Sequence, residues 1–241
     1  MLNDDYEKAA DIIREGEAVV FSGAGISTDS GIPDFRSPTG LWKQENFISL
    51  ASIEALYERR SEFIKFYRER LSKIKLANPN RSHEIIAKFE EMGLVTDVIT
   101  QNIDRLHHKA GSKKVIEIHG NLDEAYCRTC KSIFPSNILD EVEMCPNCGG
   151  AIGPNIVLFG EAMPDSFNDA IEIIKQAKTC IVIGSSLSVY PAAAIPETAL
   201  KFNEKLIIIN KTRTHLDGFA DAVFNEDSSL ALEEIYKKLT S

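Results

Sequence analysis

The chain has 241 residues, of which 44% are hydrophobic and 26% charged, and its formal net charge is -9. This length and balance are typical of one large folded core, or of a domain with a small module, and exclude a disordered or fibrous chain. Proteins that bind nucleic acid usually carry a basic stripe, whereas no basic run here exceeds two residues, so we expect no nucleic-acid partner. The acidic surface weakly favours a basic partner such as a lysine-rich peptide.

The N-terminal segment, residues 1–17, is acidic and helix-like, and it lacks the basic start and apolar middle of a signal peptide. No apolar run is long enough to span a bilayer. We therefore expect a cytoplasmic protein with no membrane partner, and a monomer by default.

Along the chain, predicted strands alternate with predicted helices. An amphipathic helix ends near Gly16, and a short apolar strand follows at 18–21. Further strands are predicted at 95–100, 114–119, 156–159, 179–183 and 205–210, and helices at 62–76, 83–92, 167–177 and 192–202. This alternation predicts an α/β, Rossmann-like fold, in which a parallel sheet carries helices on both faces.

Two segments interrupt the alternation. Residues 31–50 are rich in proline and glycine and are typical of a long functional loop that leads into helices. Residues 121–153 contain two C-x-x-C pairs. We therefore expect a discontinuous catalytic domain over 1–120 and 154–241, with a cofactor-loop and helical insertion near 31–80, and a small zinc-ribbon module over 121–153.

A glycine turn, Gly23-Ala24-Gly25, follows the first strand directly. Glycine can adopt backbone angles closed to other residues and lets the backbone approach a phosphate closely. The full dinucleotide fingerprint is not met, because Thr28 stands at its third glycine position. The turn therefore predicts either a nucleotide site or only a tight connection.

Two other strand ends favour the nucleotide site. The strand at 179–183 ends in Gly184-Ser185-Ser186, and the strand at 205–210 ends in Asn210, which could bond a ribose hydroxyl or simply form a turn. Ligands of open α/β sheets bind at the carboxyl ends of strands, so these ends together indicate one dinucleotide crevice.

The cysteine pairs are Cys127-x-x-Cys130 and Cys145-x-x-Cys148. Four thiolates at this spacing indicate one tetrahedral zinc ion, and they leave no open position for a catalytic water. We therefore expect one structural Zn²⁺. The fifth cysteine, Cys180, lies in an apolar strand and is interpreted as an inert core residue.

Polar side chains also gather after the strand at 95–100, where Gln101, Asn102 and Asp104 follow one another. They could orient water, ribose hydroxyls or a carboxamide, or Asn102 or Asp104 could cap a short helix. His119 ends another strand, where a neutral imidazole could act as a general base, although a lone histidine is more often structural. The other four histidines are interpreted as structural.

The loop at 31–50 contributes two further candidates. Arg36 could clamp a pyrophosphate, or could be an ordinary surface charge. Phe35 could cover a nicotinamide, or could simply pack inward.

These residues resemble the sirtuin family. The matching segments keep the family's order and spacing over nearly the whole chain; they lie at 23–27, 31–36, 40–42, 100–107, 118–121, 154–161 and 184–187, together with the cysteine pairs. The resemblance implies an NAD-dependent protein-lysine deacetylase, which transfers the acyl group from lysine to ADP-ribose and releases nicotinamide. This reaction is implied by the resemblance and not by composition or spacing.

The resemblance also implies roles for single residues. His119 is the implied base, assisted by Asn102 and Asp104. The implied cofactor contacts are Gly23, Ala24, Gly25, Ser27, Thr28, Asp34, Phe35, Arg36, Gln101, Asn102, Ile103, Asp104, Gly184, Ser185, Ser186, Asn210, Lys211, Asp227 and Ser228. The implied contacts to the acyl-lysine peptide are Val157, Leu158, Phe159, Gly160, Glu161 and Val189, with Tyr67 and Arg70 for the acyl group.

The acyl group is a separate question. Tyr67 and Arg70 resemble the pair by which one sirtuin class holds succinyl or malonyl carboxylates, and residues i and i+3 share a helix face. They could equally form an ordinary charged face, and that class usually has Thr where this chain has Asp34. Deacetylation is therefore expected first. The alternatives are desuccinylation, protein ADP-ribosylation and, from a different class, a non-catalytic zinc-ribbon adaptor.

Overall fold

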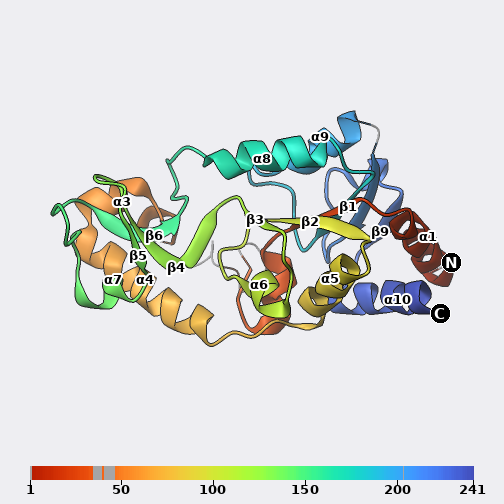
Figure 1. Ribbon diagram of the computed structural model, residues 1–241, viewed down its shortest axis with the longest axis horizontal. Coiled ribbons are helices and arrows are strands. Elements are labelled where there is room, and N and C mark those ends of the chain that lie inside the picture. The colour runs from red at the N-terminus through yellow and green to blue at the C-terminus, as the bar shows by residue number, and fades with distance from the viewer. Residues whose placement is uncertain (1, 35–39, 41–46, 203) are drawn as a thin grey trace.

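The computed structural model describes residues 2–34, 40, 47–202 and 204–241. Phe35 and Arg36 therefore lie outside the described residues. The chain forms a large and a small group of elements joined near the middle of the long axis (Figure 1). No helix in the described part is long and apolar enough to cross a membrane.

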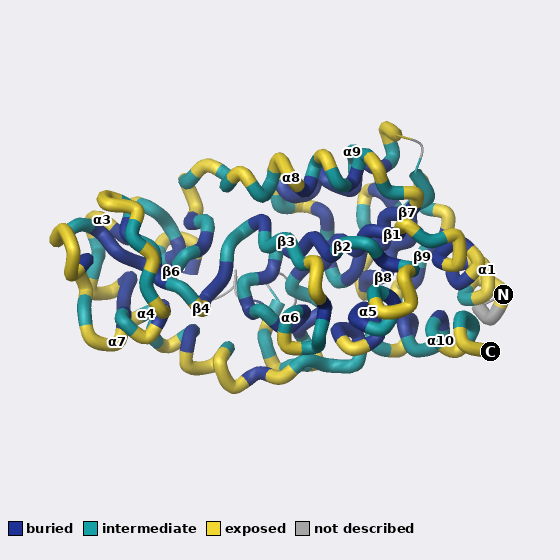
Figure 2. The backbone as a smooth tube through the Cα atoms, viewed as in Figure 1, coloured by how far each residue is buried: buried dark blue, intermediate teal, exposed yellow. Residues whose placement is uncertain are grey.

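A six-stranded sheet, all parallel, forms the centre of the large group, in the order β3-β2-β1-β7-β8-β9. Its strands are β1 (Ala18–Ser22), β2 (Val95–Thr100), β3 (Val115–Glu117), β7 (Thr179–Ile183), β8 (Lys205–Ile209) and β9 (Ala222–Phe224). β1 and β7 are buried along their whole length (Figure 2). Burial on both faces requires continuous apolar runs, which explains why these strands are visible in the sequence.

Helices cover both faces of this sheet, as predicted. One apolar cluster unites alternate strand residues such as Val20 and Ile181 with α1 (Leu2–Arg14), α5 (Arg81–Glu91) and α10 (Ser228–Thr240). The other unites Phe21 and Val182 with α8 (Asp165–Ile174) and α9 (Ala194–Lys201). The α/β, Rossmann-like prediction is thus confirmed.

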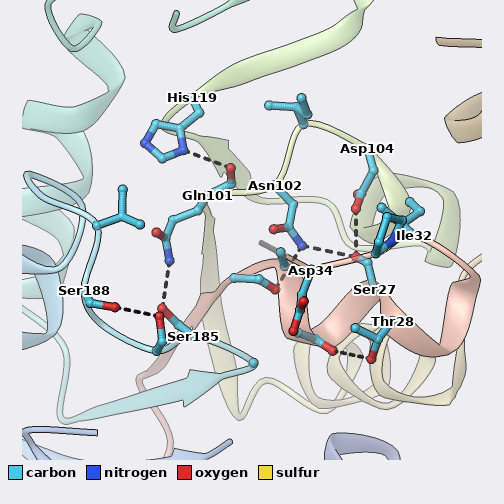
Figure 3. Close-up of a pocket in the computed structure, with 18 of the residues that line it drawn as sticks. Ser27, Thr28, Ile32, Asp34, Gln101, Asn102, Asp104, His119, Ser185 and Ser188 are labelled. Atoms are coloured by element: carbon cyan, nitrogen blue, oxygen red, sulfur yellow. Dashed lines mark hydrogen bonds between the residues drawn. The ribbon is translucent and has the colours of Figure 1, made fainter. Parts of the chain in front are cut away.

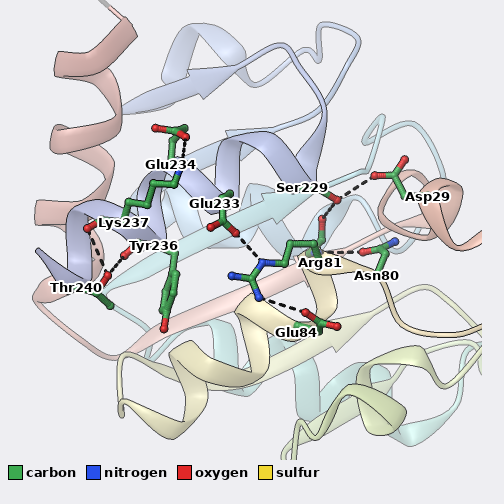
Figure 4. Close-up of polar contacts among 11 residues, drawn as sticks. Asp29, Asn80, Arg81, Glu84, Ser229, Glu233, Glu234, Tyr236, Lys237 and Thr240 are labelled. Atoms are coloured by element: carbon green, nitrogen blue, oxygen red, sulfur yellow. Dashed lines mark hydrogen bonds and ion pairs between the residues drawn. The ribbon is translucent and has the colours of Figure 1, made fainter.

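Polar contacts at the surface join α5 to α10 (Figure 4). Arg81 pairs with Glu233 at 2.6 Å and with Glu84 at 3.2 Å. Ser229 donates to Asp29 at 2.9 Å, which links α10 to the turn after β1.

The small group is built around an antiparallel sheet in the order β5-β4-β6. Its elements are β4 (Gly120–Cys127), β5 (Ile133–Pro135), β6 (Ile152–Ile156), α2 (Phe47–Leu50), α3 (Ile53–Glu58), α4 (Arg60–Lys75) and α7 (Ile138–Glu141). Leu56 and Phe63 from the helices share one apolar cluster with Leu122 and Ile152 from the sheet. We therefore propose that the helical insertion and the cysteine module form one small lobe, comprising residues 47–75 and 120–161. The remainder is called the large lobe, and the domain boundaries given from the sequence stay a prediction.

The predicted strand at 156–159 is wrong. β6 ends at Ile156 and pairs with β4 in the small sheet, not with the parallel sheet. Beyond it, Val157 donates its N–H to the His119 carbonyl, and Phe159 forms a single bridge with Ser52. Within the apolar run 156–159 only Ile156 and Leu158 are buried, while Phe159 is 41% exposed. An apolar run alone does not distinguish this arrangement from a strand.

Three shorter elements complete the fold: the 3-10 helices η1 (Ala24–Ser30) and η3 (Asp217–Phe219) and the helix α6 (Leu106–Ala110). η1 begins two residues after the end of β1, and α6 begins six residues after the end of β2. They therefore start at the carboxyl edge of the large sheet, where the candidate site lies.

Candidate functional site

A cavity of about 800 Å³ opens at the carboxyl ends of β1, β2, β7 and β8. Residues of both lobes line it, and its polar side chains face one another across it (Figure 3). Of the residues implied for cofactor and peptide, those lining the cavity are Gly23, Ala24, Gly25, Ser27, Thr28, Asp34, Gln101, Asn102, Ile103, Asp104, Gly184, Ser185, Ser186, Asn210, Lys211 and Ser228, with Tyr67, Arg70, Val157, Leu158, Phe159, Gly160, Glu161 and Val189, and His119. Asp227 is not among the lining residues.

Of the two properties of glycine considered for the turn, the structure uses close backbone approach. Neither Gly23 nor Gly25 adopts a positive φ. The left-handed residue is Gly184 at the end of β7, with φ 61°. A Cβ on Gly25 would lie 2.8 Å from the Gly184 Cα, so the two turns touch backbone to backbone. The missing side chains bring the two strand ends together at the cavity floor.

Asn102 and Asp104 are tied to the turn after β1. Asn102 Nδ2 donates to the Gly23 carbonyl at 3.1 Å and to Ser27 Oγ at 3.2 Å. Ser27 Oγ donates to Asp104 Oδ2 at 2.7 Å (Figure 3). The three side chains are therefore pre-positioned across two strand ends.

Asp104 also performs the capping role considered for it, since its Oδ1 accepts the Leu106 N–H at the start of α6 at 2.9 Å. Burial raises the pKa of Asp104, and the bonds from Leu106 and Ser27 oppose that rise. Both carboxylate oxygens thus have partners within the protein.

His119 lies at the junction between β3 and β4. Its Nδ1 is 3.0 Å from the Gln101 carbonyl, which can only accept, so Nδ1 carries the proton. Nε2 is then an unprotonated acceptor with no partner among the described residues. Burial lowers the pKa of His119, with the Gln101 bond opposing the change. A neutral imidazole with a free Nε2 is the form a general base requires.

Two of the histidines interpreted as structural are buried away from the cavity. His107 Nε2 lies 2.8 Å from Ser22 Oγ, and His83 packs edge-on against the His107 ring. Burial lowers the pKa of His83 to about 4 and that of His107 well below its usual range, so both are neutral core residues at pH 7. Neither lines the cavity.

The other end of the cavity is formed by the strand ends of β7 and β8. Gln101 Nε2 donates to Ser185 Oγ at 3.0 Å. Asn210 Nδ2 donates to the Thr212 carbonyl at 2.7 Å, so in this structure it stabilises its own turn, the alternative considered for it. Asp227 pairs with Lys211 at 2.8 Å and caps α10 through the Ser229 N–H.

The small lobe contributes an apolar wall. Tyr67 is 3% exposed, and burial raises the pKa of its hydroxyl. The Arg70 guanidinium lies 4.9 Å from the Phe47 ring and has no acidic partner among the described residues. A cation held mainly by aromatic rings inside a cavity remains available to an incoming carboxylate.

Several lining residues were missed by sequence reasoning. They are Ile32, Pro33, Phe47, Ala51, Ile74, Ile156, Met163, Ser188, Tyr190, Pro191, Ile209, Thr212 and Glu226. Four of them are next to assigned residues in the sequence, which could have identified them as candidates: Pro33, Ser188, Tyr190 and Thr212. Phe47, Ala51 and Ile74 come from the insertion, and only the packing of the small lobe places them here.

The four cysteines of the small lobe form a compact cluster. Their Sγ atoms all lie within 4.8 Å of one another, with 3.6 Å between Cys127 and Cys148 and 3.7 Å between Cys130 and Cys145. A tetrahedral zinc with bonds of about 2.3 Å separates its sulfurs by about 3.8 Å, so the arrangement fits one Zn²⁺. Backbone N–H groups of Cys130 and Gly150 point at Cys127 and Cys148, as is usual for thiolate ligands. Cys180 is fully buried within β7, as expected.

Residues 23–191 match the Sir2 family. The NAD-dependent protein deacetylase of Caldivirga maquilingensis is 43% identical over 240 residues, which covers 96% of this chain and 93% of the relative. A solved structure of Sir2 with p53 peptide and NAD⁺ superposes with a TM-score of 0.86 at 41% identity, covering 95% of both chains. A structure of Sir2 bound to acetylated peptide gives 0.86 at 39% identity, again over 95% of both chains.

Proposed function

The chain belongs to the Sir2 family, and from this premise we propose that it is an NAD-dependent protein-lysine deacetylase. The observation that carries the proposal is the state of His119. Its ring is oriented by the Gln101 carbonyl, the residue lines the cavity, and its lowered pKa keeps it neutral near pH 7. These are the properties of a base that accepts a proton from a ribose hydroxyl.

The cavity fits NAD. Its volume of about 800 Å³ lies within the range of cofactor sites. Backbone approaches closely where the turns at Gly25 and Gly184 meet, as a pyrophosphate site requires. When bound, NAD supplies the ribose carbon from which nicotinamide departs and to which the acyl oxygen is transferred. Lys211 also lines the cavity, where it is paired with Asp227 at 2.8 Å.

We assign the polar cluster to the ribose and nicotinamide half of NAD. Gln101, Asn102 and Asp104 present amide and carboxylate groups from the end of β2, each fixed by at least one internal hydrogen bond. Held in this way, they would orient the ribose hydroxyls and the carboxamide without reorganising during the reaction.

We assign residues 157–161 to the peptide. Among the described residues, the Val157 carbonyl and the Gly160 N–H have no hydrogen-bond partner, which leaves an edge to which an extended peptide can add. Val189 approaches from the large lobe, so a peptide would lie between the lobes. The acyl-lysine would then enter the apolar part of the cavity beside Phe159 and Tyr67.

The test is to incubate the protein with an acetyl-lysine peptide, with and without NAD, and to follow peptide mass and released nicotinamide. We expect loss of the acetyl mass only with NAD, with one nicotinamide per event. His119→Ala should lower the rate by roughly 10² to 10⁴, the usual contribution of a general base, while zinc content is unchanged. NAD consumption without deacetylation would instead point to another acceptor, such as a protein ADP-ribosylation site.

A second candidate function, desuccinylation or demalonylation, is favoured by the placement of Tyr67 and Arg70. Both line the cavity, and Arg70 carries a charge unpaired by any described acid. Comparing acetyl and succinyl forms of one peptide tests it. With Arg70→Met, succinyl hydrolysis should fall about tenfold or more, as for loss of a bidentate carboxylate contact, while acetyl hydrolysis should change little.

A further inference from the structure

Arg128 lies inside the cysteine cluster's first knuckle, between Cys127 and Cys130, and its side chain is only 7% exposed. An arginine between two zinc ligands would ordinarily extend into solvent. Here it folds back toward β6 and the residues that follow it, and its guanidinium lies 5.3 Å from the Tyr126 ring. A buried guanidinium requires that its donors be satisfied, so its partners show what it holds.

Those partners are the backbone carbonyls of Tyr126, Pro154 and Ile156 and the side-chain carboxylate of Glu161. Nη1 donates to the Pro154 carbonyl at 2.8 Å and to the Tyr126 carbonyl at 3.2 Å. Nη2 donates to the Ile156 carbonyl at 2.9 Å. Nε and Nη2 each lie 3.2 Å from a carboxylate oxygen of Glu161. The Arg128 side chain thus contacts residues on both sides of 157–160, namely Ile156 before them and Glu161 after them.

Glu161 in turn forms hydrogen bonds with the backbone of the segment 157–160. Its Oε2 accepts the Leu158 N–H at 2.8 Å, and its own N–H donates to the Leu158 carbonyl at 3.0 Å. The Leu158 backbone is therefore closed by Glu161, while Val157 O and Gly160 N–H stay unpartnered among the described residues. Glu161, held by Arg128, thus fixes the middle of the segment, while His119 and Ala51 accept the N–H groups of Val157 and Phe159.

We propose that Arg128 is a positioning residue for the peptide substrate, which couples the cysteine knuckle to the edge formed by residues 157–161. The inference rests on the proposed function, because it takes that edge as the peptide site. Arg128 is not among the residues that line the cavity. It acts by holding the Ile156 carbonyl and Glu161, so that the segment is ordered before the peptide arrives.

The proposal gives the cysteine knuckle a second role beside folding. The backbone N–H of Arg128 donates to the Ala151 carbonyl at 2.9 Å. Folding of the cysteine knuckle therefore also fixes the backbone position from which the Arg128 side chain extends. Nothing in this chain of contacts reaches the strand ends of β1, β7 or β8. Peptide affinity and NAD affinity should therefore separate when Arg128 is changed.

The experiment uses Arg128→Met, which keeps the apolar stem and removes every donor. Binding of a fluorescent acetyl-lysine peptide should weaken about tenfold, as for loss of charge-assisted hydrogen bonds, with the KM for NAD and the zinc content unchanged. Hydrogen exchange of the amides at 157–161 should become faster in the free protein. Arg128→Lys should restore part of the affinity, because it keeps the ion pair but not the fork.

Arg60→Met is the matched control. Arg60 also donates to backbone carbonyls of the small lobe, those of Leu56, Glu143 and Ile152, but it does not contact residues 157–161. It should lower stability without changing peptide affinity or exchange at 157–161. If Arg128→Met fails to fold or loses zinc, Glu161→Gln carries the test, since it removes the charge pair and leaves the knuckle intact.

Two results would overturn the proposal: unchanged exchange and peptide affinity in zinc-loaded Arg128→Met or in Glu161→Gln, or equal losses in Arg60→Met. Failure of the proposed function looks different. In that case the wild-type protein binds no acetyl-lysine peptide and releases no nicotinamide, whereas the exchange result still reports whether Arg128 orders the segment.

Discussion

In the large lobe every residue of β1 and β7 is buried, whereas in the small lobe β5 contains no buried residue. The large lobe has two apolar clusters, one on each face of its sheet. The small lobe has one main cluster, and two of its members are the cysteines Cys127 and Cys145. The comparison teaches that the large lobe is stabilised by burial of its sheet, while the small lobe needs its metal ligands as part of its core.

The largest expected effect is that of removing zinc. Structural zinc sites contribute on the order of 10–16 kcal/mol in small metal-dependent domains, and two of the ligands here also belong to the apolar cluster of the small lobe. Chelation, or Cys145→Ser, should therefore unfold β4, β5 and β6 and abolish peptide deacetylation. Hydrogen exchange resolved by segment is the measurement, with protection lost at 120–156 and retained in β1, β7 and β8.

Cys180→Ala is the control, because it removes a buried sulfur from β7 without touching the cluster. It should cost about 1 kcal/mol, in line with small core truncations, and leave zinc content unchanged. If zinc removal lowers hydrogen-exchange protection in both lobes together, the proposed difference between the lobes is wrong, because the large lobe would then depend on the metal as well.

The next effect concerns the contact between strand ends in the large lobe. Gly25→Ala would place a Cβ 2.8 Å from backbone atoms of Gly184, and backbone cannot move aside cheaply. The two turns must separate, so NAD affinity should fall by roughly tenfold or more, the scale of a packing strain of about 1–3 kcal/mol. Calorimetric titration with NAD measures this directly.

Gly218→Ala tests the same substitution where the added Cβ meets no atom within 4 Å. Its NAD affinity should equal that of the wild-type protein. Zinc content and exchange in the small lobe should stay unchanged in both variants, which would show that the cofactor end of the cavity can be damaged independently of the metal end.

A smaller effect is expected from pH, at the junction of the two lobes. Burial lowers the pKa of His119, and the neutral form is the base. The active form is therefore fully present above the ordinary histidine pKa of about 6.5 and is lost only as pH falls through a lower value. The acid limb of kcat/KM should thus have its midpoint below 6.5.

Acid also protonates thiolate ligands, so zinc release must be followed in the same samples. Activity that returns on neutralisation, with zinc bound throughout, assigns the limb to the histidine. A midpoint at or above 6.5 would contradict the buried, neutral imidazole described here.

The strands of the large lobe and the metal ligands of the small lobe could be predicted from the sequence. β7 was placed to the residue, because a strand buried on both faces requires a continuous apolar run. β2 was also placed to the residue, although Thr96 and Asp97 interrupt its apolar residues and are only partly buried. Spacing also identified the four cysteines, since metal ligation fixes their separation along the chain.

Contacts between distant segments were not visible in the same way. The pairing of β6 with β4, the packing of the insertion helices on them, and the Arg128–Glu161 contact depend on residues far apart in sequence. The role of a single residue such as Asn210 could not be decided from the sequence. An asparagine side chain is suited both to stabilising a turn, as Asn210 does here, and to bonding a ribose hydroxyl.

The smallest effect is expected from the surface ion pairs of Arg81 in the large lobe. Arg81 joins α5 to α10 through Glu84 and Glu233, but its side chain is 37% exposed (Figure 4). Exposed ion pairs contribute up to about 1 kcal/mol, because water screens them and ordering long side chains costs entropy. Arg81→Met should therefore lower the free energy of unfolding by less than about 1 kcal/mol, measured by urea denaturation, and the loss should shrink further in high salt. Since α5 and α10 also share the apolar cluster around Phe89 and Leu232, a much larger loss would mean that this surface contact, and not burial, holds the helices on the sheet.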